Sequence, residues 1–189
     1  MQFILASASP RRKELLSLLH IPFTVRAADI DETMDPKKTA CSEAARVSRL
    51  KALAVSRDSD DIVIAADTIV VCDNIILGKP RDKEQAFQML RMLSGRDHQV
   101  MTGCTVLRGD QAETFTEITD LHFRDLSDRE ILRYVESGEP MDKAGAYGIQ
   151  GGAALFCERL TGDYYNVVGL PVCRLFETLK NLAPEWMEV

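Results

Sequence analysis

The pattern of apolar and polar residues predicts a chain in which short strands alternate with helices. The segments with a strand pattern are residues 2–6, 23–32, 62–71, 98–109, 112–126 and 153–159. The second of them runs into an acidic loop, DIDE, which forms its last four residues. The two long segments are expected to form a hairpin that closes near Gly109–Asp110, and Asp73–Asn74 suits a tight turn after the third segment.

The predicted helices have apolar residues at helical spacing, and they cover residues 10–20, 39–56, 83–94, 128–137 and 171–182. Ser9, Asp82 and Ser127 are favoured N-cap residues before three of these helices. Pro10 suits a first helical position, and Gln85 follows Asp82 at capping-box spacing. We therefore expect a mixed α/β (α+β) fold, in which helices flank a sheet with some antiparallel neighbours.

The composition is that of a globular protein, with 189 residues of which 46% are apolar and 28% charged. This length predicts one domain, or one domain with two lobes. The net charge of −6 argues against broad nucleic-acid binding, and no membrane span or signal peptide is expected. The five cysteines are widely spaced without a CxxC pair, and the three histidines are scattered, which predicts reduced thiols in a cytoplasmic protein without a zinc site.

The first candidate site lies in residues 5–16, LASASPRRKELL, where three consecutive cations beginning at Arg11 occupy the first turn of a helix. Cations are mildly unfavourable there, because the helix dipole already places positive charge at that end. Backbone N–H groups together with Ser7, Ser9, Arg11 and Arg12 would hold a phosphate at such a turn. The alternative is a capped helix whose basic first turn is solvated.

The second candidate is Lys51, which falls in the apolar stripe of its helix among Ala40, Ala44, Val47 and Ala54. An unpaired buried lysine is costly, so Lys51 must either reach solvent with its amino group or meet an anion. The small alanines leave space beside its head group. Both interpretations, a functional cation and a lysine that reaches solvent, stay open on this pattern.

The third candidate is Asp67, which interrupts the apolar strand IVIAADTIVV. Aspartate is among the poorest strand residues, so the local pattern gives no reason for a carboxylate there. We interpret Asp67 as a carboxylate held on a rigid strand, where it could ligate a metal or act as a general base toward water. The alternative is an aspartate that hydrogen-bonds the backbone at a strand end or bulge.

Three weaker signals complete the pattern. The acidic loop with Asp29, Asp31 and Glu32 suggests Mg²⁺ or Mn²⁺ beside a phosphate site, although such loops are often only solvated. Lys79 precedes a proline and is therefore presented from an extended loop end. Gln150 lies in the glycine-rich segment DKAGAYGIQGG, where its amide could read a base edge, unless this segment is only a turn. Together these residues suit hydrolysis of a nucleoside triphosphate.

Six motifs in order resemble the Maf family of nucleoside triphosphate pyrophosphatases: LASASPRR, AADTIVV, GKPRD, MLRMLSG, DKAGAYGIQG and VVGLP. The resemblance covers nearly the whole chain and implies one domain over residues 1–189. It implies an elongated mixed sheet in two lobes with a central cleft, similar to inosine triphosphate pyrophosphatases. It also implies cleavage between the α- and β-phosphates, to a nucleoside monophosphate and pyrophosphate, with a divalent metal.

The resemblance also implies roles for individual residues. Asp67 maps onto the proton acceptor, and Glu32 maps onto the glutamate of the acidic loop, which would hold the metal together with Asp67. The residues that would contact the phosphates are Ser7, Ser9, Arg11, Arg12, Lys51 and Lys79.

One branch of the family prefers dTTP and UTP, and another prefers 7-methyl-GTP. The dTTP/UTP branch has Arg, Thr and Gln at three positions that this chain fills with Arg11, Thr68 and Gln150. A neutral amide suits an uncharged pyrimidine imide, which agrees with that branch. Two alternatives are a nucleotide-binding regulator of cell division without significant catalysis, and the same chemistry on 7-methyl-GTP. A homodimer is a family-level expectation, and no nucleic-acid or membrane partner is expected.

Overall fold

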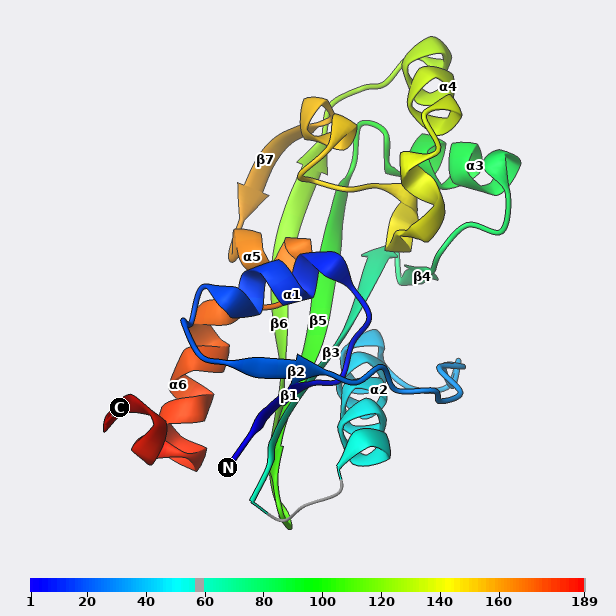
Figure 1. Cartoon of the computed structure of the whole chain (residues 1–189). Coiled ribbons are helices and arrows are strands. Elements are labelled where there is room, and N and C mark those ends of the chain that lie inside the picture. Colours follow the sequence, from blue (N-terminus) through cyan, green and yellow to red (C-terminus); the bar gives the residue numbers. More distant parts are fainter. Residues whose placement is uncertain (57–59, 189) are drawn as a thin grey trace. The chain divides into compact units, whose positions relative to one another are not determined.

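The computed structural model describes residues 1–56 and 60–188, in which seven strands form one mixed sheet (Figure 1). The strands are β1 (Phe3–Leu5), β2 (Phe23–Val25), β3 (Ile62–Cys72), β4 (Ile75–Leu77), β5 (Asp97–Arg108), β6 (Gln111–Phe123) and β7 (Cys157–Thr161). Their order is β2-β1-β3-β5-β6-β7, and β4 pairs with β3 outside this path. Strand β1 is parallel to β2 and β3, whereas β4 and β7 are antiparallel to β3 and β6. The predicted mixed sheet with helices is confirmed.

Four of the helices in the described part of the chain begin after a capping side chain. The helices are α1 (Pro10–Ser17), α2 (Ala40–Val55), α3 (Lys83–Leu93), α4 (Asp128–Glu136), α5 (Tyr164–Val168) and α6 (Val172–Leu182). Ser9, Thr39, Asp82 and Ser127 each accept a hydrogen bond from a backbone N–H of the first turn, and Ser127 forms a full capping box with Glu130. Gln85 instead accepts its bond from the backbone of Arg81.

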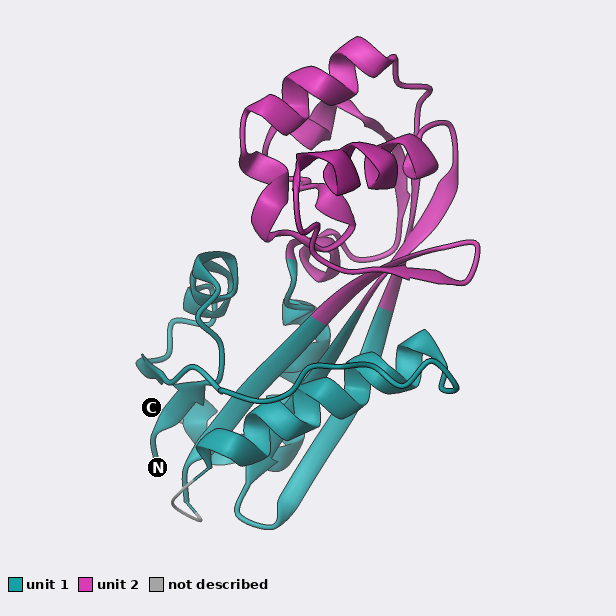
Figure 2. Ribbon diagram, turned by 90° about the vertical axis from the view of Figure 1, so that its right-hand side faces the viewer, with its two compact units in different colours: residues 1–67, 102–117, 169–189 teal, residues 68–101, 118–168 magenta. Residues whose placement is uncertain are grey.

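The chain divides into two compact units, which Figure 2 distinguishes by colour. Unit 1 comprises Met1–Asp67, Thr102–Glu117 and Gly169–Val189. Its core contains buried side chains from β1, α2, β3 and β5 and from the residue after β1, namely Ile4, Ala6, Ala52, Val55, Val63, Ala65 and Leu107. A Cβ atom at Gly103 of β5 would collide with the backbone of Ala44, so helix α2 lies directly on this strand.

Unit 2 comprises Thr68–Met101 and Ile118–Val168. Helix α3 packs against α4 over a second core, which includes Val70, Leu90, Leu93, Leu121, Phe123, Ile131, Tyr147 and Phe156. In this core the rings of His98, Phe123 and Tyr147 meet edge to face. Strand β3 passes from unit 1 to unit 2 between Asp67 and Thr68, so the site residues predicted from the sequence are divided between the two units.

Several predicted elements differ from the structure. The strand expected near residues 153–159 is present but begins later, because Gly152–Leu155 form a 3-10 helix and the strand, β7, covers Cys157–Thr161. A short apolar run does not by itself separate a strand from a helical turn. The strand expected at residues 23–32 ends at Val25, and the acidic loop that follows is turned by a bond from Thr33 N to Asp31.

Two helical predictions also need correction. Helix α1 ends at Ser17 rather than near His20, which has a left-handed φ of 55°. Helix α5 is not predicted, since it has only five residues and no stripe long enough to detect. No helix among the described residues is long and apolar enough to cross a membrane.

Candidate functional site

The strand-to-helix turn after β1 holds its polar side chains in a fixed arrangement. Ser7 is buried, and its Oγ accepts hydrogen bonds from Ser9 N at 3.2 Å and from Arg12 Nη1 at 3.3 Å. Ser9 Oγ caps helix α1 by accepting from Arg12 N at 3.4 Å. Arg12 Nε donates to the carbonyl oxygen of Gly169 at 2.8 Å, although 157 positions separate the two residues in sequence.

Gly169, in the VVGLP motif, connects that motif to Arg12 in the LASASPRR motif. Its φ of 124° lies in a region that side chains disfavour, and this conformation presents its carbonyl oxygen to Arg12. Burial lowers the pKa of the Arg12 guanidinium, and the negative charges of Asp67 and Glu32 oppose that shift. Arg11, the second arginine of the turn, is half-buried and adds positive charge beside Arg12. The turn therefore concentrates positive charge in a partly dry setting.

Lys51 lies between two carboxylates. Its Nζ is 2.7 Å from Asp67 Oδ1 and 3.0 Å from Glu32 Oε1. Lys51 and Asp67 are only 7% and 6% exposed, which rules out a lysine whose head group merely reaches solvent, whereas Glu32 lies at an exposed loop position. Of the predicted site residues, these three and the group around Arg12 are brought together within unit 1.

Helix α2 and strand β3 are what place this ion pair. The buried face of α2 includes Val47, Lys51 and Val55, so Lys51 follows the apolar stripe into the core. Ala54, which we expected on the same stripe, is exposed instead. Asp67 is one of the buried residues of β3 and points its carboxylate at the ammonium, which explains a carboxylate within an apolar strand.

A buried glutamate that the sequence reasoning missed supports the loop on which Glu32 lies. Glu43 is 0% exposed, and its carboxylate accepts hydrogen bonds from Arg46 Nε and Nη2 and from Asp35 N at 2.8 Å. Arg46 Nη2 in turn donates to the carbonyl oxygen of Thr33 at 2.8 Å. The bonds from Arg46 and Asp35 lower the pKa of Glu43 to about 2. A glutamate three residues before an arginine was the available signal, but it is common on exposed helices.

The remaining predicted site residues lie in unit 2. Thr68 is half-buried on β3, directly after Asp67. Lys79 is exposed between the end of β4 and the buried Pro80, as its presentation from a loop end predicted. Gln150 is exposed in the glycine-rich segment, and its side chain makes no hydrogen bond to the described residues of unit 2. These positions leave Lys79 and Gln150 accessible to a ligand.

The carboxylates near Lys51 bear on where a divalent cation could bind. Among residues 1–56 and 60–188 no group of three or more His, Cys, Asp or Glu side chains could hold a metal ion. In the acidic loop, Asp29 is exposed and Asp31 accepts a hydrogen bond from Thr33 N. Glu32 is the residue of this loop that shares the ammonium group of Lys51 with Asp67. Two carboxylates with oxygen donors fit Mg²⁺ or Mn²⁺ when phosphate oxygens supply further ligands.

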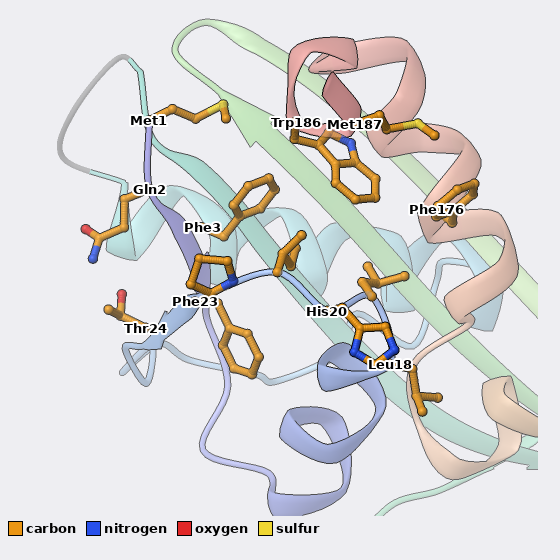
Figure 3. A pocket seen from close by; sticks show the side chains of 13 residues that line it. Met1, Gln2, Phe3, Leu18, His20, Phe23, Thr24, Phe176, Trp186 and Met187 are labelled. Carbon is orange, nitrogen blue, oxygen red and sulfur yellow. The ribbon is translucent and has the colours of Figure 1, made fainter. Parts of the chain in front are cut away.

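A separate pocket of about 810 Å³ lies in unit 1 and has a different character (Figure 3). Aromatic side chains of Phe3, Phe23, Phe176 and Trp186 line it, and the ring of Trp186 meets those of Phe3 and Phe176 edge to face. None of the predicted site residues contributes to its lining. We therefore place the candidate chemistry at Arg12, Lys51, Glu32 and Asp67 and not in this pocket.

Comparison with known proteins gives a consistent family. A family model described as Maf-like protein matches residues 2–182. A dTTP/UTP pyrophosphatase of Alkaliphilus oremlandii (strain OhILAs) is 52% identical over 184 residues, which cover 95% of each chain. A dTTP/UTP pyrophosphatase of Geobacillus sp. (strain WCH70) is 49% identical over 183 residues, which cover 96% of this chain and 98% of that one.

A much weaker likeness links the chain to the Ham1 protein of Staphylococcus aureus, with a TM-score of 0.47 and 17% identity over 66% of this chain and 73% of that one. The family assignment does not use that likeness. It rests on the family model, whose match over residues 2–182 includes the turn after β1, Glu32, Lys51 and Asp67. The chain therefore belongs to the Maf family.

Proposed function

We propose that this protein hydrolyses nucleoside triphosphates, with dTTP and UTP as substrates, to the nucleoside monophosphate and pyrophosphate. The observation that carries the proposal is the buried ion pair of Lys51 and Asp67, which Glu32 joins. The chain that holds this pair is 52% identical to a relative named dTTP/UTP pyrophosphatase. A nucleotide sensor has no need of a carboxylate held ready in this way, so the pair favours an enzyme over a regulator that only binds.

Asp67 is the proton acceptor in this proposal. A water oxygen forms a bond to the α-phosphorus, the bond from that phosphorus to the oxygen bridging to the β-phosphate breaks, and pyrophosphate leaves. The proton of the water passes to the carboxylate of Asp67. Support comes from the position of Asp67 on a buried strand, where its orientation is fixed by the 2.7 Å bond from Lys51.

The cations stabilise the charge of the phosphates in the transition state. Arg12 suits this role because Gly169 and Ser7 already hold its guanidinium, so little order is lost when a phosphate binds. Arg11 lies next to it on the same turn, and backbone N–H groups at the start of α1 add to the site. Lys51 and the exposed Lys79 supply the remaining positive charge.

Glu32 and Asp67 would hold a divalent cation, Mg²⁺ or Mn²⁺, together with phosphate oxygens. When bound, such a cation neutralises phosphate charge and makes water more acidic. In this proposal Lys51 keeps the two carboxylates close to each other before substrate arrives, because its ammonium offsets their mutual repulsion.

Base recognition falls to Arg11, Thr68 and Gln150 in this proposal. An amide both donates and accepts, so Gln150 can pair with the imide of uracil or thymine, which presents one N–H and one carbonyl oxygen. The five cysteines are free, which agrees with a cytoplasmic protein that acts on the nucleotide pool. A homodimer stays a prediction.

Product analysis tests this function. The purified protein is incubated with dTTP, UTP, CTP, GTP and 7-methyl-GTP, each with Mg²⁺ or Mn²⁺, and the phosphorus-containing products are separated. We expect pyrophosphate with TMP or UMP. Orthophosphate with a nucleoside diphosphate would refute the proposed bond cleavage, preference for 7-methyl-GTP would reassign the base, and tight binding without turnover would support a regulator.

A further inference from the structure

Two side chains outside the predicted site hold the segment that carries Gln150. Gly148 N donates a hydrogen bond to Tyr134 Oη at 3.0 Å, and Gly152 N donates to Glu139 Oε2 at 3.0 Å. Tyr134 Oη itself donates to Glu139 Oε1 at 2.8 Å, which joins the two anchors. Gln150 lies midway between the two anchored glycines. Its backbone is therefore fixed from both sides by one connected pair.

The pair is itself firmly placed. Tyr134 belongs to the buried face of α4, is 6% exposed, and its ring meets that of Phe156 edge to face. Burial raises the pKa of Tyr134, so its hydroxyl stays a donor to Glu139. Glu139 is half-buried and begins a 3-10 helix three residues after the end of α4.

The glycines of this segment have no room for a side chain against the pair. A Cβ atom at Gly152 would lie 3.1 Å from the ring of Tyr134, and one at Gly151 would collide with the carboxylate of Glu139. Their backbone therefore lies directly against Tyr134 and Glu139. Gln150 is exposed, so the contacts that hold the backbone on either side of it leave its side chain accessible.

The earlier part of the segment is fixed separately. Gly145 N donates to the carbonyl oxygen of Gly78 at 3.1 Å, next to Lys79. Tyr147 Oη lies 2.9 Å from His98 Nε2 inside the core of unit 2. Removing a hydrogen bond of Tyr134 or Glu139 should therefore loosen residues 148–152 without releasing residues 144–147.

We propose that Tyr134 and Glu139 are positioning residues that fix Gln150 for base recognition and so set the preference for a pyrimidine imide over cytosine. The inference rests on the proposed function, in which Gln150 reads the base. Cytosine presents an amino group and a ring acceptor where uracil presents a carbonyl oxygen and an N–H. A side-chain amide that can shift and rotate by 180° pairs with either pattern. Discrimination between uracil and cytosine therefore requires that the backbone of Gln150 be held in place.

Two conservative variants test the pair, and a third serves as a matched control. Tyr134→Phe removes the hydroxyl but keeps the ring packing, and Glu139→Gln keeps the size but weakens the accepted bonds. Glu136→Gln changes an exposed glutamate of the same helix whose salt bridge is to Lys83. We measure kcat/KM of each protein for UTP and CTP. We expect the UTP/CTP ratio to fall about tenfold in both test variants, mainly through a higher KM for UTP, and to be unchanged in Glu136→Gln.

The same measurement in a Gln150→Ala background separates positioning from general structural damage. If the pair acts through Gln150, Tyr134→Phe and Glu139→Gln cause no further change in the UTP/CTP ratio once Gln150 is removed. A loss that persists undiminished in this background would overturn the proposal. So would a ratio that stays at the wild-type value in both single variants.

Amide hydrogen exchange provides a readout that does not depend on turnover. We expect the amides of Gly148 and Gly152 to be protected in the wild type and to exchange faster in Tyr134→Phe and Glu139→Gln, while Gly145 stays unchanged. Equal exchange in wild type and variants would overturn the proposed anchoring. If the wild type hydrolyses none of the nucleotides, the proposed function fails by itself, and this exchange experiment still decides whether the pair holds the segment.

Discussion

Lys51 Nζ contacts Asp67 Oδ1 at 2.7 Å, and neither side chain is explained by the element that carries it. Lys51 stands in the apolar face of α2, and Asp67 stands in the apolar strand β3. Each charge would be unfavourable at its buried position alone, and each compensates the burial of the other. The pair, extended by Glu32, is the part of unit 1 in which the proposed proton acceptor, a cation and a second carboxylate meet.

Replacing Asp67 by asparagine should abolish most turnover. Asn keeps the size of the side chain but cannot accept the proton of water, and positioned general bases contribute about 10²- to 10⁴-fold to rate. We expect kcat to fall by that range with a folded protein, which circular dichroism checks. Activity within a few-fold of wild type in a folded variant would refute the role of Asp67.

Replacing Lys51 by methionine should lower both stability and activity. The change leaves Asp67 buried without its ammonium and close to Glu32, and breaking a buried ion pair typically costs about 3–5 kcal/mol. Denaturant unfolding measures the loss. Arg49→Met, which removes an exposed cation of the same helix, should stay within about 0.5 kcal/mol of wild type. Equal stability of the two variants would contradict the account of Lys51.

Replacing Glu32 by glutamine should weaken the response to the divalent cation. The proposal gives the cation only two carboxylates, so losing one charge should raise the Mg²⁺ concentration for half-maximal rate at least about tenfold. Chelation with EDTA should stop turnover in the wild type, and added Mg²⁺ should restore it. The exposed Asp29 offers a matched control, and Asp29→Asn with the same shift would show that the effect is one of general surface charge.

Replacing Gly169 by alanine should displace the side chain of Arg12, which is hydrogen-bonded to Gly169 although the two are far apart in sequence. A φ of 124° is unfavourable for alanine by about 1–3 kcal/mol, so the carbonyl oxygen that accepts from Arg12 Nε should move. We expect a less stable protein with a raised KM for the nucleotide. Gly78→Ala, where a Cβ atom meets nothing within 4 Å, should leave the midpoint of unfolding near that of wild type. A normal KM in Gly169→Ala would argue against this link.

The buried Glu43 should make stability depend on pH in the acid range. Its pKa is lowered from 4.5 to about 2 in the folded protein, so the unfolded chain takes up the proton first as pH falls. The stabilisation is complete above about pH 4.5 and declines as pH falls toward 2. The free energy of unfolding of Glu43→Gln should therefore depend less on pH in that window, whereas Glu113→Gln, at an exposed site, should follow the wild-type curve. Identical slopes for all three proteins would contradict the linkage.

Local signals in the sequence predict much of this fold. Helix α2 follows its apolar stripe and its Thr39 cap, and the turn at Asp73 and Asn74 has the left-handed φ values of 49° and 64° that such residues tolerate. Asp67 and Lys51 were detectable because each breaks the pattern of its element. A residue that violates local preference without a local reason is a reasonable candidate for function.

Other relationships have no local signal. The contact between Arg12 and Gly169 spans 157 positions, and the bond between Glu43 and Asp35 depends on how the acidic loop folds back onto α2. The anchors of Gln150 lie in a helix and a 3-10 turn that periodicity describes only as apolar or polar. The 3-10 helix at Gly152–Leu155 takes the place of the first part of an expected strand, and the bond from Gly152 N to Glu139 that holds its start joins residues 13 positions apart.

The most direct test of the central claim is the fate of oxygen from water. Hydrolysis of dTTP in water enriched in ¹⁸O, followed by mass spectrometry of the products, reveals which phosphorus is attacked. Attack on the α-phosphorus, assisted by Asp67, places the label in TMP and leaves pyrophosphate unlabelled. Label in pyrophosphate would mean attack on the β-phosphorus and would contradict the proposed roles of Asp67 and the cations around it.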